Sequence, residues 1–466
     1  MLSNTLMGIK RPEKLPGFYK TLLVIALPIT LQQLMQTFVN MLDTIMVGRL
    51  GAVAIAAVGL GNQVFFILNM ILFGISSGGS IFIAQYWGKR DIAGIRHTMG
   101  IMLSFSMAAS FLFAFGAVCF PEILISMYSK DLAVIREGSR YLRYVGLSYP
   151  VMAFGFVYQF AFRSTEHVRL PMVSTTISFC INAVFNYIMI FGMHFVLGPL
   201  HITVPEMGVM GAAIATVISR CAELAILLVY SYLHKYEASG PLHEIFGFNH
   251  YTVIKFLKIA FPVIFNETLW GTGITIQNSI FSHAGTDAIA AFNITSTISQ
   301  LTWVFFIGMG NGAAIIIGKR IGAGNTDEAK RYAYRIAWFM PLTAFFIGML
   351  LYPLSFVLPL LFKVDSGIIR QAQLMLIVLM CNYPFNAFNM CMIVGICRSG
   401  GDTKFGAFCD LFWMWACSIP LGIAAAFIFH WQPWQIYLCL QTEQILKTVT
   451  GFMRLRSGKW LHNVTI

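Results

Sequence analysis

A single carboxylate, Asp43, lies inside a long apolar stretch that runs from Leu22 to Val47. A charged carboxylate at the centre of a bilayer costs about 2.5–3.5 kcal/mol on insertion scales, so it is rarely kept for packing alone. Acidic residues at this depth normally face a water-filled cavity and serve an ion or proton pathway. Asp43 is therefore predicted to be a functional site that binds H+ or a cation such as Na+ and faces a cavity rather than lipid.

Neutral oxygen donors accompany this carboxylate. Gln36 and Asn40 precede Asp43 in the same stretch, while Asn182 and Asn186 are four residues apart and share one face of a later helix. Amide and carboxylate oxygens are hard donors, suited to Na+ or to stabilising a proton relay. Hydrogen bonding between helices is the alternative role for each lone amide.

Other acidic residues lie in apolar stretches further along the chain. Glu267 is predicted to bind substrate or ion, with Gln277 and Asn278 of the same stretch nearby. Three further acids, Glu223, Asp410 and Glu443, are predicted to form structural ion pairs, since Arg220 and Lys447 stand one turn from Glu223 and Glu443.

Two prolines stand within such stretches, Pro28 and Pro262. Proline inside a helix leaves a carbonyl without its hydrogen bond and kinks the helix. Each kink is either static or a hinge that responds to the charge on Asp43, and both possibilities stay open.

The elements that carry these residues are transmembrane helices. Of 466 residues, 58% are hydrophobic and 11% charged, whereas soluble domains carry about 25% charged residues. Apolar runs of about 20 residues or more can each cross a bilayer. We expect an all-α polytopic membrane protein with twelve spans, near residues 20–47, 53–85, 94–118, 134–161, 170–195, 208–233, 253–281, 287–317, 329–354, 368–396, 405–429 and 433–453.

Basic residues indicate the orientation of these spans. Most of the 31 Lys and Arg residues fall on the side of the N-terminus, with Arg163 and Arg398 assigned to loops on that side. Since cytoplasmic loops are enriched in Lys and Arg, both termini are predicted to be cytoplasmic in a cell membrane. Contact with anionic lipid accounts for the net charge of +12 without a nucleic-acid partner.

The chain contains an internal repeat. A shift of 234 residues superimposes Pro28 on Pro262, and Gly74 and Gly78 on Gly308 and Gly312. Six spans per repeat predict two pseudo-symmetric lobes of the same orientation, with the substrate site between them. We expect lobes at residues 1–235 and 251–466, joined by a polar cytoplasmic linker at residues 236–250.

Several classes of function find no support. The sequence holds no nucleotide-binding or zinc-protease motif, and its nine cysteines form no C-x-x-C pair. We therefore expect no enzyme activity, cofactor or resident metal other than Na+ at Asp43, and transport driven by an ion gradient.

Four groups of residues resemble the multidrug and toxic compound extrusion (MATE) family. They are Asp43-Thr44-Ile45-Met46-Val47-Gly48, Ala84-Gln85-Tyr86-Trp87-Gly88 with its partner Gly318-Lys319-Arg320-Ile321-Gly322-Ala323-Gly324, the stretch from Pro205 to Thr216, and the Arg-Ser pairs at Arg163 and Arg398. The matches cover the first lobe and at least half of the second.

This resemblance implies cation-coupled export of amphipathic, often cationic compounds. It further implies that Asp43, Asn182, Asn186 and Thr216 line a cation site in the first lobe. Some relatives carry a second carboxylate on span five, where this chain has Asn186, and others carry an acidic residue on span ten, where this chain has Asn382, Asn386 and Asn389. Asn386 is therefore expected to line the substrate cavity, and a second cation site and the choice between H+ and Na+ stay open.

The rival function is a flippase for lipid-linked precursors, which shares the two-lobe plan and would need a cationic cavity for phosphates. The expected partners are small organic substrates and the lipid bilayer, with the protein as a monomer.

Overall fold

The computed structural model describes residues 17–197, 200–356 and 365–465. Its helices match the twelve predicted spans, so the all-α membrane class is confirmed. The first lobe contains α1 (Phe18–Gly48), α2 (Ala52–Lys89), α3 (Ile92–Cys119), α4 (Pro121–Ser126), α5 (Leu132–Val145), α6 (Ser148–Ser164), α7 (Arg169–Phe191) and α8 (Val209–Leu233). After α9 (Leu242–Ile245), the second contains α10 (His250–Ala284), α11 (Thr286–Gly322), α12 (Thr326–Ser355), α14 (Ser366–Met390) with η1 (Cys391–Cys397), α15 (Thr403–Trp413), η2 (Met414–Ser418), α16 (Ile419–Ile423), η3 (Ala424–Ile428) and α17 (Pro433–Ser457).

By length and composition, nine described helices can cross a membrane, or ten if the bent pair α5 and α6 forms one span. The bend between those two helices is 49°. Pro150 lies in the first turn of α6, where proline is tolerated, whereas in a continuous helix it would remove a hydrogen bond and its ring would clash with the carbonyl four residues before it. Helices α10 and α17 fall outside this set, and both carry polar residues such as Glu267 and Lys447.

The structure departs from the prediction at the end of the fifth span. Helix α7 ends at Phe191, four residues early, because Gly192 adopts a φ of 73° and turns the chain out of the helix. The residues that follow form an antiparallel hairpin of β1 (Met193–Leu197) and β2 (Leu200–Val204), which the sequence analysis did not predict.

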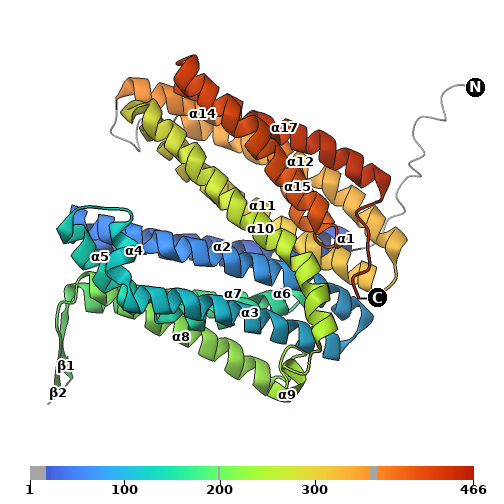
Figure 1. The fold of residues 1–466 in the computed structure, drawn as a ribbon, viewed down its shortest axis with the longest axis horizontal. Coiled ribbons are helices and arrows are strands. Elements are labelled where there is room, and N and C mark those ends of the chain that lie inside the picture. Colours follow the sequence, from blue (N-terminus) through green and yellow to red (C-terminus); the bar gives the residue numbers. More distant parts are fainter. Residues whose placement is uncertain (1–16, 198–199, 357–364, 466) are drawn as a thin grey trace, which may run out of the picture.

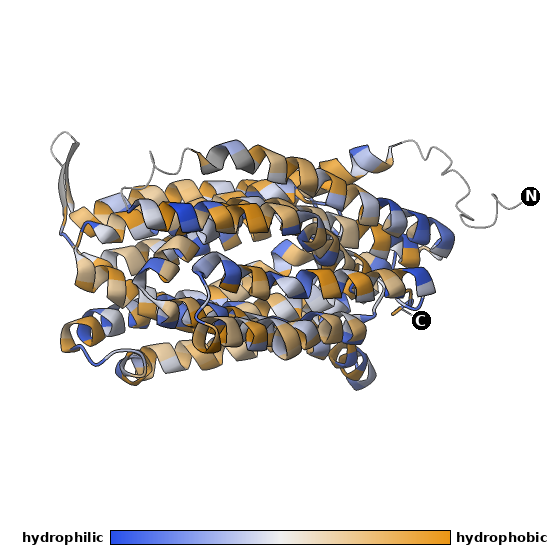
Figure 2. Ribbon diagram, turned by 90° about the horizontal axis from the view of Figure 1, so that it is seen from above, coloured by the Kyte–Doolittle hydropathy of each residue, from blue (hydrophilic) through white to orange (hydrophobic). Residues whose placement is uncertain are grey.

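Figure 1 shows two bundles that meet at the end where the C-terminus lies and diverge toward the hairpin. Apolar residues cover most of the lengths of the outer helices, and hydrophilic ones gather toward their ends (Figure 2). That distribution is the one a bilayer selects, since apolar side chains must face hydrocarbon.

The first helix of each lobe packs its first half into the other lobe. Phe18, Leu22 and Ile29 of α1 belong to the core cluster of the second lobe, whereas Phe256 and Ala260 of α10 belong to a core cluster of the first. Pro28 and Pro262 lie at the ends of these exchanged segments, inside helices that continue past them.

Glycines make this exchange possible. A methyl group at Gly74 or Gly78 of α2 would lie 2.6 Å from the Ile264 Cα or 2.8 Å from the Ala260 Cα of α10. The repeat-related Gly308 of α11 approaches α1 in the same way, 3.0 Å from the Thr30 Cα. Small residues let helix backbones approach closely in a membrane, so these contacts hold the lobes together.

A second set of contacts joins the lobes near the C-terminus. Gln85 of α2 donates to the Ser399 and His462 carbonyls at 2.8 and 3.2 Å and accepts from the Val464 amide at 2.8 Å. Trp460 in the same terminal segment is fully buried. The C-terminal residues therefore bridge the two lobes.

The segment predicted as a linker is held against the first lobe. Arg96 of α3 donates to the Glu237 and Ser239 carbonyls at 3.1 and 2.7 Å and pairs with Glu244. The lobe and linker boundaries themselves stay a prediction.

Candidate functional site

Asp43 meets Asn186 near the end of α1. The Asn186 side-chain amide donates to the Asp43 carboxylate and, at 3.0 Å, to Oδ1 of Asn182. Both asparagines are buried, and because they are four apart on α7 they point to the same side. Oδ1 of Asn186 is buried without a hydrogen-bond partner.

A cavity of about 350 Å³ lies between the lobes, and a second one of about 310 Å³ lies within the first lobe. The first-lobe cavity is lined by Asp43, Asn182 and Thr216, together with Gln36 and Asn40. Gln36 and Asn40 line the interlobe cavity too, so the two cavities share a wall. The Thr216 hydroxyl donates to the Ala212 carbonyl at 3.0 Å, which leaves the lone pairs of its oxygen available.

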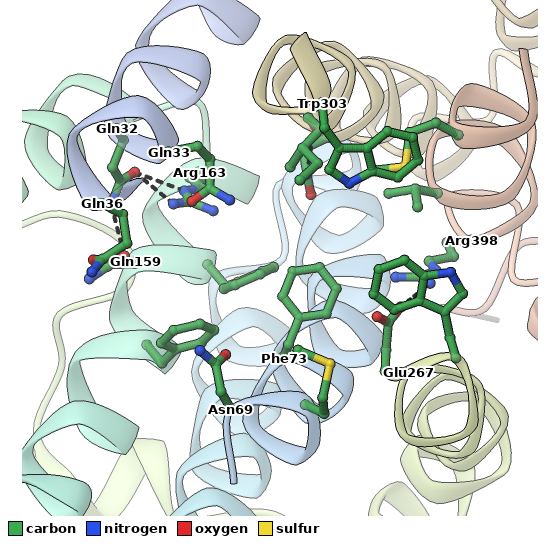
Figure 3. Close-up of a pocket in the computed structure, with 18 of the residues that line it drawn as sticks. Gln32, Gln33, Gln36, Asn69, Phe73, Gln159, Arg163, Glu267, Trp303 and Arg398 are labelled. Carbon is green, nitrogen blue, oxygen red and sulfur yellow. Dashed lines mark hydrogen bonds and ion pairs between the residues drawn. The ribbon is translucent and has the colours of Figure 1, made fainter. Parts of the chain in front are cut away.

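The interlobe cavity combines aromatic rings with charged side chains. Phe73 of α2, Trp270 of α10 and Trp303 of α11 line it, and Figure 3 shows the Phe73 ring between the polar groups of the two lobes. Asn386 also lines this cavity. Aromatic faces attract organic cations and stack on flat ligands, so the cavity has the surface that such ligands need.

The first-lobe wall of the interlobe cavity carries Arg163. Its guanidinium donates to Oε1 of Gln32 at 2.7 and 3.1 Å. Gln32 in turn donates to the Thr175 hydroxyl at 2.9 Å, and Thr175 donates to Glu223 at 2.7 Å. Glu223 also forms an ion pair with Arg220 at 2.9 Å, which confirms the predicted pair.

On the opposite wall, Glu267 forms an ion pair with Arg398, whose guanidinium also donates to the Ser77 hydroxyl at 2.8 Å. Figure 3 shows Arg398 and Glu267 together, on the other side of Phe73 from Arg163. Lys447 pairs with Asp410 at 2.7 Å and with Glu443 at 3.4 Å. The predicted Glu443–Lys447 pair is confirmed, and Asp410 gains the partner that the sequence did not identify.

Two predictions about position are wrong. Arg163 and Arg398 do not lie in surface loops: they are 6% and 5% exposed and line the interlobe cavity. They are also related by the repeat, and their equivalent positions four helices into each lobe could have indicated that both face the pseudo-symmetry axis.

Gln277 and Asn278 lie outside both large cavities. Gln277 donates to the Ser418 hydroxyl at 3.3 Å, and Asn278 is exposed. Gln277 is the repeat equivalent of Asp43. This position is therefore polar in both lobes, and in the second lobe its side chain forms a hydrogen bond between helices.

No group of three His, Cys, Asp or Glu residues in the described part of the chain is arranged to hold a metal ion. Every cysteine that the structure describes is free.

The fold and the two cavities define a class: a two-lobed helical membrane protein with one cavity between its bundles and another inside the first bundle. The family model MatE matches residues 28–188 and 262–424, more than half of the chain and once in each lobe, so the chain belongs to the MATE family of transporters.

Curated relatives support this assignment at low identity. The chain is 23% identical to "Probable multidrug resistance protein YoeA" of Bacillus subtilis, over 89% of this chain and 88% of that protein. It is 24% identical to "Probable multidrug resistance protein NorM" of Thermotoga maritima, over 96% and 94%. The solved structure "Crystal structure of MATE in complex with MaL6" has the same fold, with a TM-score of 0.81 at 20% identity over 95% of this chain and 97% of that one.

Proposed function

We propose that this transporter exports amphipathic organic cations, drugs and toxic compounds among them, in exchange for H+ or Na+ by alternating access. The observation that carries the proposal is the carboxylate of Asp43, bonded to Asn186 in a cavity that shares a wall with the aromatic interlobe cavity. The shared wall gives an ion at Asp43 a route to influence an organic cation between the lobes.

Orientation supports export. With both termini cytoplasmic, the end where the bundles diverge faces the outside, and the sealed end faces the cytoplasm. Lys319 of the second lobe pairs with Glu166 of the first at 2.6 Å on that sealed side. Such a conformation is ready to release substrate outward and take up the coupling ion.

The oxygens at Asp43 suit either ion. Na+ would be held by the Asp43 carboxylate with oxygens from Asn182, Asn186 and Thr216, and Oδ1 of Asn186 already lacks a donor. A proton would instead reside on the carboxylate itself, with the asparagines stabilising its neutral form.

Coupling follows from competition. Neutralising Asp43 removes a negative charge that attracts an organic cation through the shared wall. Ion and substrate then favour different states of the lobes, and that difference in affinity is what couples their movements.

Pro28 and Pro262 are proposed as the hinges, because each ends a segment that packs into the opposite lobe. Residues 1–235 and 251–466 would move as the two bodies of a monomer, with residues 236–250 as the linker.

An Asp43→Asn variant tests the proposal. In proteoliposomes with an imposed pH or Na+ gradient, uptake of the fluorescent cation ethidium should be lost, because asparagine can neither bind a proton nor supply charge for Na+. Asp131→Asn is the matched control, since Asp131 is exposed and caps α5, a role that asparagine also fills. Gradient-driven uptake by Asp43→Asn at the control rate would refute the proposed role.

A flippase for lipid-linked precursors is the second candidate, and one observation favours it. The Arg163 guanidinium donates to the neutral Gln32, so its positive charge is available to attract a phosphate. Against it, Arg220, Arg398 and Lys447 are each paired with a carboxylate on the cavity wall. The same vesicles distinguish the two functions, because a flippase would not accumulate ethidium under an ion gradient.

A further inference from the structure

The second lobe buries more negative than positive charge around Lys447. We call Lys447, Asp410 and Glu443 the Lys447 cluster. Lys447 is 2% exposed and Glu443 is 4% exposed. One ammonium group stands between two carboxylates, at 2.7 Å from Asp410 and 3.4 Å from Glu443. A buried charge without compensation is costly, so the cluster needs one further positive charge.

The two carboxylates are not equivalent. Both oxygens of Asp410 have partners, Lys447 on one and the Asn266 amide at 3.1 Å on the other. Glu443 accepts at Oε1 from the Gln444 amide at 3.1 Å, while its Oε2 is buried with no partner. The missing positive charge therefore belongs at Oε2 of Glu443.

A second buried oxygen without a donor lies beside the cluster. Asn266, 2% exposed, gives its amide hydrogens to Asp410 and leaves its own Oδ1 without a partner. Buried acceptors are normally satisfied, and here two of them, Asn266 Oδ1 and Glu443 Oε2, flank the same Lys447–Asp410 pair.

We propose that Glu443 is a proton-binding site in the second lobe, separate from Asp43. The proton binds Oε2 of Glu443 and leaves to water in the interlobe cavity, which Asp410 and Lys447 line. A proton fits better than Na+, because the Lys447 ammonium group already occupies the space between the carboxylates and would repel a metal cation.

The surrounding charges support a single proton. Glu443 faces Lys447 on its own helix and Asp410 on α15, and behind Asp410 lies Glu267 of α10, itself paired with Arg398. Helix α16 and the segments η2 and η3 contain no Asp, Glu, Lys, Arg or His, and Asn389 of α14 meets Gln444 with a neutral amide. The charged residues of α11 and α14 (Asp287, Lys319, Arg320 and Arg370) stand toward the ends of those helices.

Infrared difference spectroscopy of the full-length protein tests this directly, because a protonated carboxyl group has a C=O band that a carboxylate lacks. Spectra taken between acidic and alkaline buffer should show a band that Glu443→Gln removes and Asp43→Asn leaves in place. No substrate is needed, so the result does not depend on the proposed transport function.

Glu223 supplies the matched control. It is 3% exposed, but both its oxygens are bonded: Oε1 to Thr175 and Gln159 at 2.7 and 3.1 Å, and Oε2 to Arg220 at 2.9 Å. Glu223→Gln should keep the titrating band, and a Glu443→Gln spectrum identical to wild type would overturn the proposal. If Glu443→Gln fails to fold, Glu443→Asp serves instead: a shifted band supports the site and an unshifted band overturns it.

Discussion

At the scale of single residues, the interior of this transporter contains charge pairs between residues that are distant in the chain. Arg398 and Glu267 are 131 residues apart in the chain and form a buried pair, with side chains 6% and 12% exposed. Both side chains are largely buried, so each charge depends on the other, because removing one partner of a buried pair costs about 3–5 kcal/mol.

The Arg398–Glu267 pair is therefore expected to behave as a unit. Glu267→Gln and Arg398→Gln should each lower the melting temperature in detergent by several degrees, since each leaves one charge buried alone. The double variant should recover part of the loss. A thermal unfolding cycle with all three variants measures the coupling.

An exposed pair provides the control for this cycle. Glu137 and Arg140 are 3.5 Å apart and 35% and 60% exposed, so Glu137→Gln should change stability by less than about 0.5 kcal/mol. Additive losses in the Glu267/Arg398 cycle would show that the two residues are not coupled.

At the scale of helices, the lobes contact each other where glycines of α2 and α11 pack against α10 and α1 near the two prolines. Gly78 of α2 meets Ala260 of α10 two residues before Pro262, and Gly312 of α11 meets Ala26 of α1 two residues before Pro28. The repeat thus produces two equivalent crossings, and each lets a helix pass from one lobe into the other.

Widening one crossing should destabilise the protein and impair transport. In Gly78→Val, the side chain would meet the Ala260 backbone at 2.8 Å, so α2 and α10 must separate. We expect a lower melting temperature and slower ethidium uptake. Gly59→Ala in the same helix is the control: nothing lies within 4 Å, and alanine favours the helix by about 0.5–1 kcal/mol. Equal stability of the two variants would show that the crossing tolerates separation.

At the scale of the whole molecule, the closed end near the C-terminus depends on contacts between segments that are distant in sequence. Gln85 joins α2 to Ser399 and to the C-terminal residues. Glu166, in the turn between α6 and α7, pairs with Lys319 of α11 and accepts a hydrogen bond from the Trp87 indole at 3.2 Å. The proposed alternating access requires these bonds to break when the closed end opens.

Removing residues 460–466 should loosen the closed end, because Trp460 and the Val464 amide would no longer bridge the lobes. Hydrogen–deuterium exchange should become faster in residues 85–91 and 319–325 and stay unchanged in α5, which lies at the opposite end (Figure 1). Unchanged exchange at both closing segments would exclude a role for the C-terminal residues in closure.

The sequence alone determined the membrane class, the twelve spans and the two-lobe repeat, and it singled out Asp43 as the candidate ion site. Hydrophobic length, repeat spacing and the cost of a buried charge are all local properties that can be read along one chain. Asn182 and Asn186 could be placed on one face for the same reason, because helical periodicity is local.

Only the tertiary structure decided which charges distant in sequence meet. It moved Arg163 and Arg398 from expected loops to the cavity wall, left Gln277 and Asn278 outside the cavities, and brought Asp410 to Lys447. Helix periodicity sets the face of one helix, but the partner across a bundle depends on how helices cross. In this protein those crossings depend on glycine contacts between lobes, more than 150 residues apart in sequence.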